Sequence, residues 1–215
     1  MVIAIDGPAG SGKSTTAKLL ANKLNFIYLD SGAMYRAVTL YFLRESIDIN
    51  DRDIISENLD NLNLSIDFVN QFEVSINGFN VMDEIRSNEI DALVSSVSKI
   101  DIVRKKMVDI QRIFSKDKNV VVEGRDIGSH VFPDAAFKFF LVADIAERAK
   151  RRLTQIGASD SLKITQLIEN LEKRDKIDSS RSISPLIKSD DAIEIDTTNL
   201  TIEEQVSKIY KIINN

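Results

Sequence analysis

The sequence predicts a three-layer α/β fold, in which a five-stranded parallel sheet is flanked by helices on both faces. Five short, almost continuously apolar runs are separated by helical stretches, and a glycine-rich turn follows the first run. One stretch in the middle of the chain instead alternates apolar with polar residues. Continuous apolar strands are typical of a parallel sheet covered on both faces, whereas alternation is typical of an antiparallel sheet with one exposed face. The fold class is therefore α/β with a small antiparallel insert.

The predicted strands of the parallel sheet are bounded by turn residues or helical stretches. A helix from Thr15 to Asn25 follows the first strand, because its leucines and alanines recur at helical spacing. A last helix opens at Thr201, where Glu204 three residues later completes a capping-box pattern. The five strands are Val2–Asp6, Phe26–Asp30, Val120–Val122, Phe137–Val142 and Ala192–Ile195.

The antiparallel insert is predicted between Leu62 and Met82. Alternation runs through 64–68 and 72–76, and Asn77-Gly78 is a strong hairpin turn. The insert interrupts the parallel series between the second and third strands, so we expect a separate lobe at the ligand-binding edge of the sheet. The single domain 1–215 is predicted to comprise a core of 1–45 and 115–215, an insert of about 46–114 and a short lid of about 148–162.

Composition excludes several classes of site. The 215 residues include no cysteine and one histidine, so disulfides, thiolate metal sites and histidine-rich metal sites are excluded, and any metal must be held by oxygens. A net charge of −5 argues against binding a nucleic-acid polymer. The chain has no long apolar run and no basic leader. We expect a cytoplasmic monomer that binds no membrane, and a structural role for His130.

The glycine-rich turn matches G-x-x-x-x-G-K-[ST] between a predicted strand and a predicted helix. Its glycines let successive N–H groups face one anion, and the helix adds its positive end. Lys13 is expected to reach the β and γ phosphates of ATP, and the Ser14 hydroxyl is expected to bind Mg²⁺. A glycine turn without a ligand is the alternative, which the flanking strand and helix disfavour. The predicted ATP-binding residues of the loop are Gly7, Pro8, Ala9, Gly10, Ser11, Gly12, Lys13, Ser14 and Thr15.

The loop alone does not identify the reaction, because transferases, motor-type hydrolases and nucleotide switches share it. A switch GTPase needs an Asn-Lys-x-Asp guanine reader after a late strand. The nearest string, Asn22-Lys23-Leu24-Asn25, lies in the first predicted helix and lacks the aspartate. The switch interpretation is therefore disfavoured.

A second anion site is predicted from arginines. Arg36 follows the second strand and Arg125 follows the third, and the ends of parallel strands are where ligands collect. Both arginines can therefore converge on a second phosphate by bidentate hydrogen bonds. For each arginine alone, a solvated surface position or a carboxylate partner is an equal alternative. Together they imply an acceptor that itself carries a phosphate.

At these residues the chain resembles the cytidylate kinases of bacterial type, within the nucleoside monophosphate kinases. The similarity extends over the whole length of the chain. Related kinases share the phosphate loop, so the strings that begin at Tyr28 and at Gly124 are more diagnostic than the loop. The strings that carry the similarity are Ile5 to Ser14, Tyr28-Leu29-Asp30-Ser31-Gly32-Ala33-Met34-Tyr35-Arg36, Gly124-Arg125-Asp126-Ile127-Gly128 with Val131 to Ala135, and Arg174-Asp175 with Asp178, Ser179 and Arg181.

The resemblance implies a role for each matching residue. Glu123 stands where members of the family often carry an aspartate, and the insert matches their enlarged monophosphate-binding lobe. Lys13, Arg125 and Arg181 are the implied catalytic residues. Arg36, Arg125 and Arg181 are implied to hold the acceptor phosphate, Ser95, Arg104 and Asp126 to read the cytosine ring, and Ser31, Arg174 and Asp178 to contact the sugar.

A basic helix after the fourth strand predicts the lid. It carries Arg148, Lys150, Arg151 and Arg152 and is followed by Gly157-Ala158-Ser159. Arg148 and Arg152 are predicted to contact ATP when the lid closes. A solvated basic face is the alternative.

The predicted reaction is Mg²⁺-dependent transfer of the γ-phosphoryl group of ATP to CMP or dCMP. Two alternatives stay open at this point. Another small-molecule kinase would take UMP, a different monophosphate or a shikimate-like acceptor. A non-catalytic nucleotide sensor would bind ATP and CMP without forming product.

Overall fold

The chain forms two compact units in the computed structural model, which describes residues 1–68, 72–155 and 161–215. The first unit comprises Met1–Tyr28 with Asp117–Asn215, and the second comprises Leu29–Lys116. The second unit contains the predicted insert of about 46–114 and also the helix α2 (Ser31–Arg44), which packs against elements of that insert. Each unit is described here by itself.

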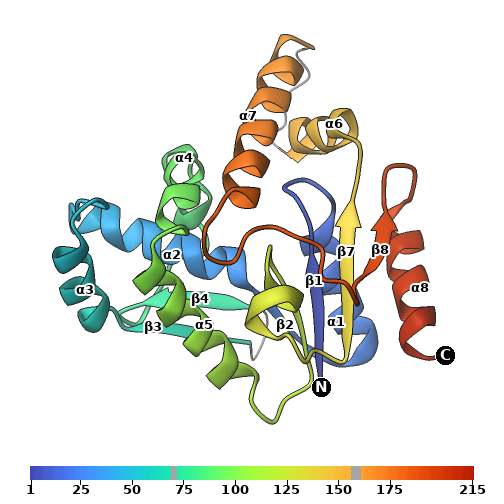
Figure 1. The fold of residues 1–215 in the computed structure, drawn as a ribbon, viewed down its shortest axis with the longest axis horizontal. Coiled ribbons are helices and arrows are strands. Elements are labelled where there is room, and N and C mark those ends of the chain that lie inside the picture. Colours follow the sequence, from blue (N-terminus) through green and yellow to red (C-terminus); the bar gives the residue numbers. More distant parts are fainter. Residues whose placement is uncertain (69–71, 156–160) are drawn as a thin grey trace. The chain divides into compact units, whose positions relative to one another are not determined.

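The parallel sheet has the strand order β2-β6-β1-β7-β8, which confirms the predicted five-stranded sheet (Figure 1). β1 pairs in parallel with both β6 and β7, and β7 pairs in parallel with β8. Two strands have the predicted bounds, two differ by one residue at one end, and the last is shifted by one residue at both ends. The strands are β1 (Val2–Asp6), β2 (Ile27–Asp30), β6 (Val120–Glu123), β7 (Phe137–Val142) and β8 (Ile193–Asp196).

Helices bury one face of this sheet in a core that includes Ile3, Leu20, Phe139 and Ile209. The last helix begins with the predicted capping box, in which Thr201 accepts a hydrogen bond from the Glu204 N–H and the Glu204 carboxylate accepts one in return. The helices of the first unit are α1 (Lys13–Leu24), the short π-helix η2 (Ile127–Val131), α6 (Ile145–Gln155), α7 (Ser161–Ser179) and α8 (Ile202–Ile213).

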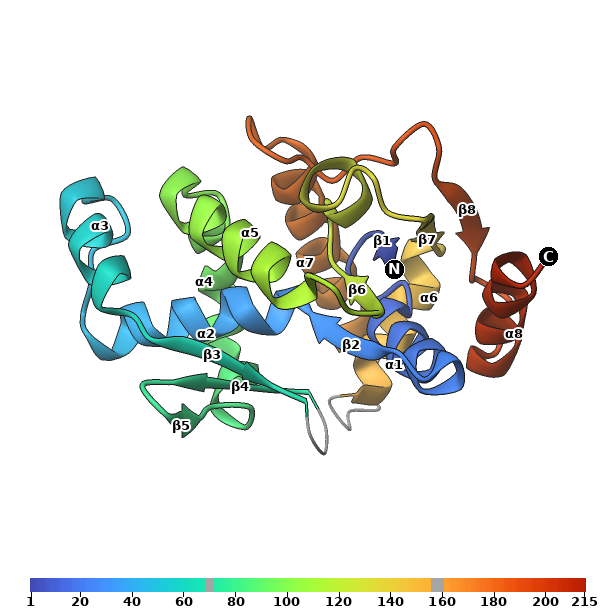
Figure 2. The same ribbon diagram turned by 90° about the horizontal axis from the view of Figure 1, so that it is seen from below.

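The second unit contains the antiparallel sheet that alternation predicts, and α2 lies alongside it (Figure 2). Its strands are β3 (Leu64–Asp67), β4 (Glu73–Ile76) and β5 (Phe79–Asn80). The predicted Asn77-Gly78 turn joins β4 to β5, with φ of 52° and 83° as such a turn requires. The helices are α2, α3 (Arg52–Asn61), the 3₁₀ turn η1 (Glu84–Arg86), α4 (Asn88–Val97) and α5 (Asp101–Ser115).

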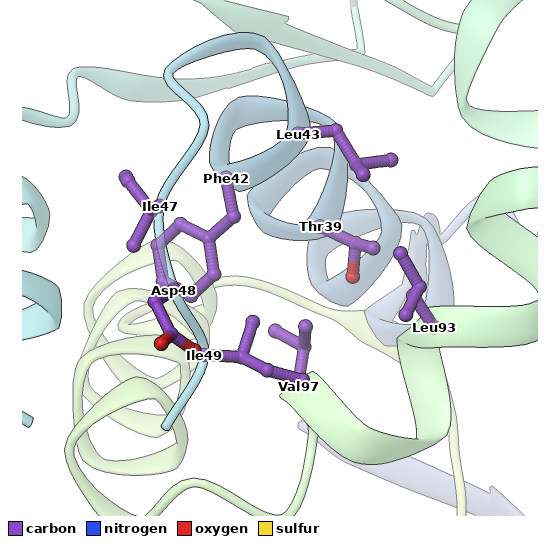
Figure 3. A pocket seen from close by; sticks show the side chains of 8 residues that line it. All are labelled: Thr39, Phe42, Leu43, Ile47, Asp48, Ile49, Leu93 and Val97. Carbon is purple, nitrogen blue, oxygen red and sulfur yellow. The ribbon is translucent and has the colours of Figure 1, made fainter. Parts of the chain in front are cut away.

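A cavity of about 220 Å³ lies in the second unit between α2, the segment after it and α4 (Figure 3). Its lining is mostly apolar, and it shares no residue with the predicted sites. The lining residues are Thr39, Phe42, Leu43, Ile47, Asp48, Ile49, Leu93 and Val97. Among the helices that the structure describes, none has the length and apolarity that crossing a membrane requires.

Candidate active site

The phosphate loop follows β1, and its glycines are required by its backbone. Gly7 has a φ of 144°, and a Cβ there would lie 2.1 Å from the Leu141 carbonyl oxygen, so any side chain would collide with the backbone of β7. Gly12 has a φ of 93° and is the N-cap of α1. Among the described residues, no side chain forms a hydrogen bond that caps the N-terminus of α1, and the first turn of α1 carries no acidic residue. The first N–H groups of α1 are therefore available to an anion.

Two buried side chains near the C-terminal end of the described chain hold this loop. The Thr197 hydroxyl lies 3.0 Å from the Ser11 carbonyl oxygen, to which it can donate. The Thr16 hydroxyl donates to Gln205 Oε1 at 2.7 Å. Sequence reasoning missed both Thr197 and Gln205, since no local motif marks a residue that acts on a loop more than 180 positions away.

Lys13 is folded back over the loop. It is 4% exposed, and its ammonium group donates to the Pro8 carbonyl oxygen at 2.6 Å. The pKa of Lys13 is lowered to about 7, mainly by burial and also by the charges of Arg125 and Arg174, while Glu123 opposes the change. A phosphate in the loop would supply the negative charge that this site lacks.

Glu123 ends β6 beside the loop, and both of its carboxylate oxygens accept hydrogen bonds. The Ser14 hydroxyl donates to Oε2 at 2.9 Å, and the Tyr28 hydroxyl donates to Oε1 at 2.5 Å. Ser14 and Glu123 therefore place two oxygen atoms that could bind a metal ion next to each other. Sequence reasoning identified these two residues but assigned no role to Tyr28, although Tyr28 begins one of the strings that carry the resemblance.

Two of the predicted acceptor-phosphate arginines meet on one carboxylate. Arg125 Nε donates to Asp178 Oδ2 at 3.0 Å, and Arg181 donates to Oδ1 of the same residue. Asp178 is 1% exposed, so this carboxylate is held by charge-assisted hydrogen bonds in place of water. The structure thus brings together Arg125, Asp178 and Arg181, which come from two segments of the chain.

Asp6 fixes the turn that carries Asp126. Its two carboxylate oxygens accept hydrogen bonds from the N–H groups of Ile127, at 2.9 Å, and Gly128, at 2.7 Å. The pKa of Asp6 is raised to about 6, mainly by burial and also by the charge of Asp126, while the two backbone hydrogen bonds and Lys13 oppose the rise. Asp6 was not predicted as a site residue, although it belongs to the string before the loop.

The raised pKa of Asp6 predicts a pH-dependent stability. Because the folded pKa of about 6 exceeds the unfolded value of 3.8, this carboxyl stabilises the fold below the unfolded pKa and loses that contribution as pH rises through 6. The difference corresponds to about 3 kcal/mol. The free energy of unfolding of the wild type, relative to Asp6→Asn, should therefore fall between pH 4 and pH 7 in urea titrations. Asp134→Asn, at an exposed carboxylate, is the control, and an Asp6 difference as flat as that of Asp134 would contradict the expectation.

Arg148 of α6 is buried against the loop. Its guanidinium donates to the Ala9 carbonyl oxygen at 3.1 Å and pairs with Asp175 of α7 at 2.5 Å. Arg152 lies on the same helix and donates to Gln155 at 3.3 Å. The Gly157-Ala158-Ser159 part of the predicted lid lies outside the described residues.

The predicted site residues of the second unit come from three helices. Asp30 caps α2 by accepting from the Ala33 N–H at 2.9 Å, which places Ser31 in the first turn of the helix. Arg36 donates to the Ile85 carbonyl oxygen at 3.1 Å and pairs with Asp91. A carboxylate partner was the alternative to phosphate binding for each arginine, and Asp91 is such a partner for Arg36.

Arg104 and Ser95 are buried in the same unit. The Arg104 guanidinium donates to the Ser98 carbonyl oxygen at 3.1 Å and lies 5.5 Å from the centre of the Tyr35 ring, a cation–π contact. The predicted site thus falls into two groups. Gly7–Thr15, Arg125, Asp126, Arg174, Asp178 and Arg181 belong to the first unit, and Ser31, Arg36, Ser95 and Arg104 belong to the second.

Together, the parallel sheet, the glycine loop at the end of its central strand and the buried lysine define a phosphate-loop protein that binds a nucleoside triphosphate. A family model described as cytidylate kinase matches residues 3–215. The chain therefore belongs to the cytidylate kinase family of nucleoside monophosphate kinases, which confirms the resemblance predicted from its sequence strings.

Individual relatives agree with this assignment. The chain is 48% identical to a cytidylate kinase of Fusobacterium nucleatum over 98% of this chain and 96% of the relative. It is 46% identical to a cytidylate kinase of Clostridioides difficile over 100% of this chain and 98% of the relative. In fold it is similar to an uncharacterized protein from Eubacterium ventriosum, with a TM-score of 0.53, 16% identity and coverage of 100% of this chain and 99% of that one.

Proposed function

We propose that the protein transfers the γ-phosphoryl group of ATP to the 5′-phosphate of CMP or dCMP, giving ADP and CDP or dCDP. The observation that carries the proposal is the buried Lys13, whose pKa is lowered by Arg125 and Arg174 as well as by burial. One cationic field thus covers both the phosphate loop and the arginines of the acceptor site. Such a field favours two phosphate groups that approach each other.

On the donor side, the loop from Gly7 to Thr15 binds the phosphates of ATP through backbone N–H groups and Lys13. Arg148 and Arg152 are proposed to contact ATP from α6. Arg148 is already anchored to the Ala9 carbonyl oxygen, so its charge stays beside the loop.

On the acceptor side, Arg125 and Arg181 hold the phosphate of CMP together with Arg36 of the second unit. Asp178 supports this role, because it fixes two of the three guanidinium groups before any substrate binds. Ser31, Arg174 and Asp178 are proposed to contact the sugar.

The cytosine ring is proposed to lie against Ser95, Arg104 and Asp126. Cytosine donates from its exocyclic amine and accepts at its ring nitrogen and carbonyl oxygen, which makes a carboxylate and a guanidinium complementary partners. Both Asp126 and Arg104 are buried, at 4% and 2% exposed. A base that failed to match them would leave a buried charge unpaired.

Mg²⁺ is the proposed metal, and the residues present fit it. Mg²⁺ prefers oxygen ligands and keeps most of its sites for water and phosphate, and Ser14 and Glu123 offer adjacent oxygens at the loop. Within the described residues, no group of three or more histidines or carboxylates is arranged to hold a metal ion. When bound, Mg²⁺ neutralises charge on the transferring phosphoryl group.

The protein itself positions the two substrates and neutralises the negative charge of their phosphates. The acceptor phosphate oxygen is already a nucleophile, so the transfer requires no general base and no covalent intermediate on the protein. Lys13, Arg125 and Arg181 stabilise the charge of the in-line transition state. Closure over the bound substrates is proposed to exclude water, which would otherwise intercept the phosphoryl group.

A substrate panel tests the proposal. We expect ADP release with CMP and dCMP in the presence of Mg²⁺, much less with UMP or AMP, and none without the metal. Release with UMP, AMP or shikimate instead of CMP would identify a different acceptor. Binding of ATP and CMP without product would indicate a nucleotide sensor. The monomeric state and the cytoplasmic location stay predictions, and sedimentation velocity tests the first.

A further inference from the structure

The feature that the proposed function leaves unexplained is Tyr28. Its hydroxyl reaches Oε1 of Glu123 at 2.5 Å, while the Ser14 hydroxyl occupies Oε2 at 2.9 Å. The three residues come from the strand β2, the strand β6 and the first turn of α1. One carboxylate therefore joins three elements of the first unit, and each of its oxygens has a separate hydroxyl donor.

Glu123 needs such a donor for two physical reasons. It is 4% exposed, and a buried carboxylate is costly unless its oxygens accept hydrogen bonds. Glutamate also has one more rotatable bond than aspartate, so the end of a strand alone does not fix its carboxylate. Without a second donor, the carboxylate could rotate toward the cation of Lys13, with which it already interacts electrostatically.

The packing of the Tyr28 ring fixes the position of its hydroxyl group. The ring packs against the core cluster beneath the sheet, and a tyrosine side chain has only two rotatable angles that affect its shape. The hydroxyl is therefore held by packing and not by the carboxylate that it binds.

We propose that Tyr28 is a positioning residue, whose hydroxyl holds the Glu123 carboxylate beside Ser14 in the orientation that the metal–nucleotide complex requires. The inference rests on the proposed Mg²⁺-dependent function and adds to it a role for a residue to which the sequence strings assign none. Tyr28 acts through Glu123, and residues that support metal-site groups in this way commonly change metal affinity about 10- to 100-fold when they are replaced.

Tyr28→Phe tests the role, because it removes one hydroxyl and keeps the ring in the core. We expect the Mg²⁺ concentration for half-maximal rate to rise about tenfold, with the KM for CMP unchanged. Independently of turnover, Mn²⁺ binding to the enzyme–ADP complex, measured by electron paramagnetic resonance, should weaken by a similar factor. Tyr210→Phe is the matched control, since Tyr210 packs against the same core cluster from α8, and it should leave both quantities at wild-type values.

A double-mutant cycle separates positioning from a general structural effect. In a Glu123→Gln background, Tyr28→Phe should change Mn²⁺ binding by less than about twofold, because the carboxylate that it positions is already gone. Wild-type Mn²⁺ affinity in Tyr28→Phe, or an equal loss in both backgrounds, would overturn the inference. A wild-type enzyme that phosphorylates no CMP with Mg²⁺ would contradict the proposed function instead, so the two failures are distinct.

Discussion

Replacing Lys13 with alanine is expected to lower kcat for ATP and CMP by about a thousandfold, while the protein stays folded. The lysine is the charge of the loop nearest to the transferring group in the proposed mechanism, and no general base shares its task. The fold should tolerate the loss, since burial already disfavours the lysine charge and lowers its pKa to about 7. Coupled ADP-release kinetics measure the first effect, and urea unfolding measures the second.

Two further variants make this result interpretable. Lys13→Met keeps most of the side-chain volume and removes only the charge, so it should lose as much activity as Lys13→Ala. Lys18→Ala removes an exposed lysine from the same helix and should retain wild-type kcat. Substantial activity in both Lys13 variants would disprove the assignment of the loop as the donor site.

Asp126→Ala is expected to lower the ratio of kcat/KM for CMP to that for UMP at least about tenfold, with little change in the KM for ATP. The carboxylate is buried and can accept from the amine of cytosine, whereas uracil presents a carbonyl oxygen that repels it. An unpaired buried polar group costs about 1–3 kcal/mol, which accounts for the tenfold figure. Kinetics with both nucleotides at saturating ATP give the ratio directly.

Asp134→Ala is the control for this change, because it removes an exposed carboxylate eight positions further along the same segment. It should leave the CMP-to-UMP ratio unaltered. If Asp126→Ala also leaves the ratio unaltered, the base is recognised elsewhere.

The fold was predictable from the sequence wherever a local pattern decides the structure. The bounds of Val2–Asp6 and Phe137–Val142 were correct, because each is a mostly apolar run that is followed by a turn or by polar residues. The capping box at Thr201 and the Asn77-Gly78 turn were correct for the same reason, since four or fewer neighbouring residues determine them. The sequence does not indicate that α2 packs within the second unit, because packing against other helices leaves no local signal.

The candidate site was predictable only as a set of residue types. The strings around Lys13 and Arg125 identify which residues carry charge, but Asp178 receives Arg125 from 53 positions away, and no spacing rule indicates that pairing. The sequence predicts that Arg148 belongs to a basic helix that faces either solvent or ATP. In the structure Arg148 is buried, and it donates a hydrogen bond to the Ala9 carbonyl oxygen of the loop. Long-range hydrogen bonds of this kind depend on how the elements pack, which the linear pattern does not contain.

The anchoring of the phosphate loop also has a consequence for the newly made chain. β1 lies between strands that are synthesised much later, with Val2 opposite Val120 and Ile3 opposite Phe137. At about 5–20 residues per second, on the order of ten seconds pass before the first of these partners exists. The loop further depends on Thr197 and Gln205, near the other end of the sequence. The loop therefore reaches its final form only after these residues have been made, and chaperones that bind an unpaired apolar strand are expected to protect the nascent β1 until its partner strands exist.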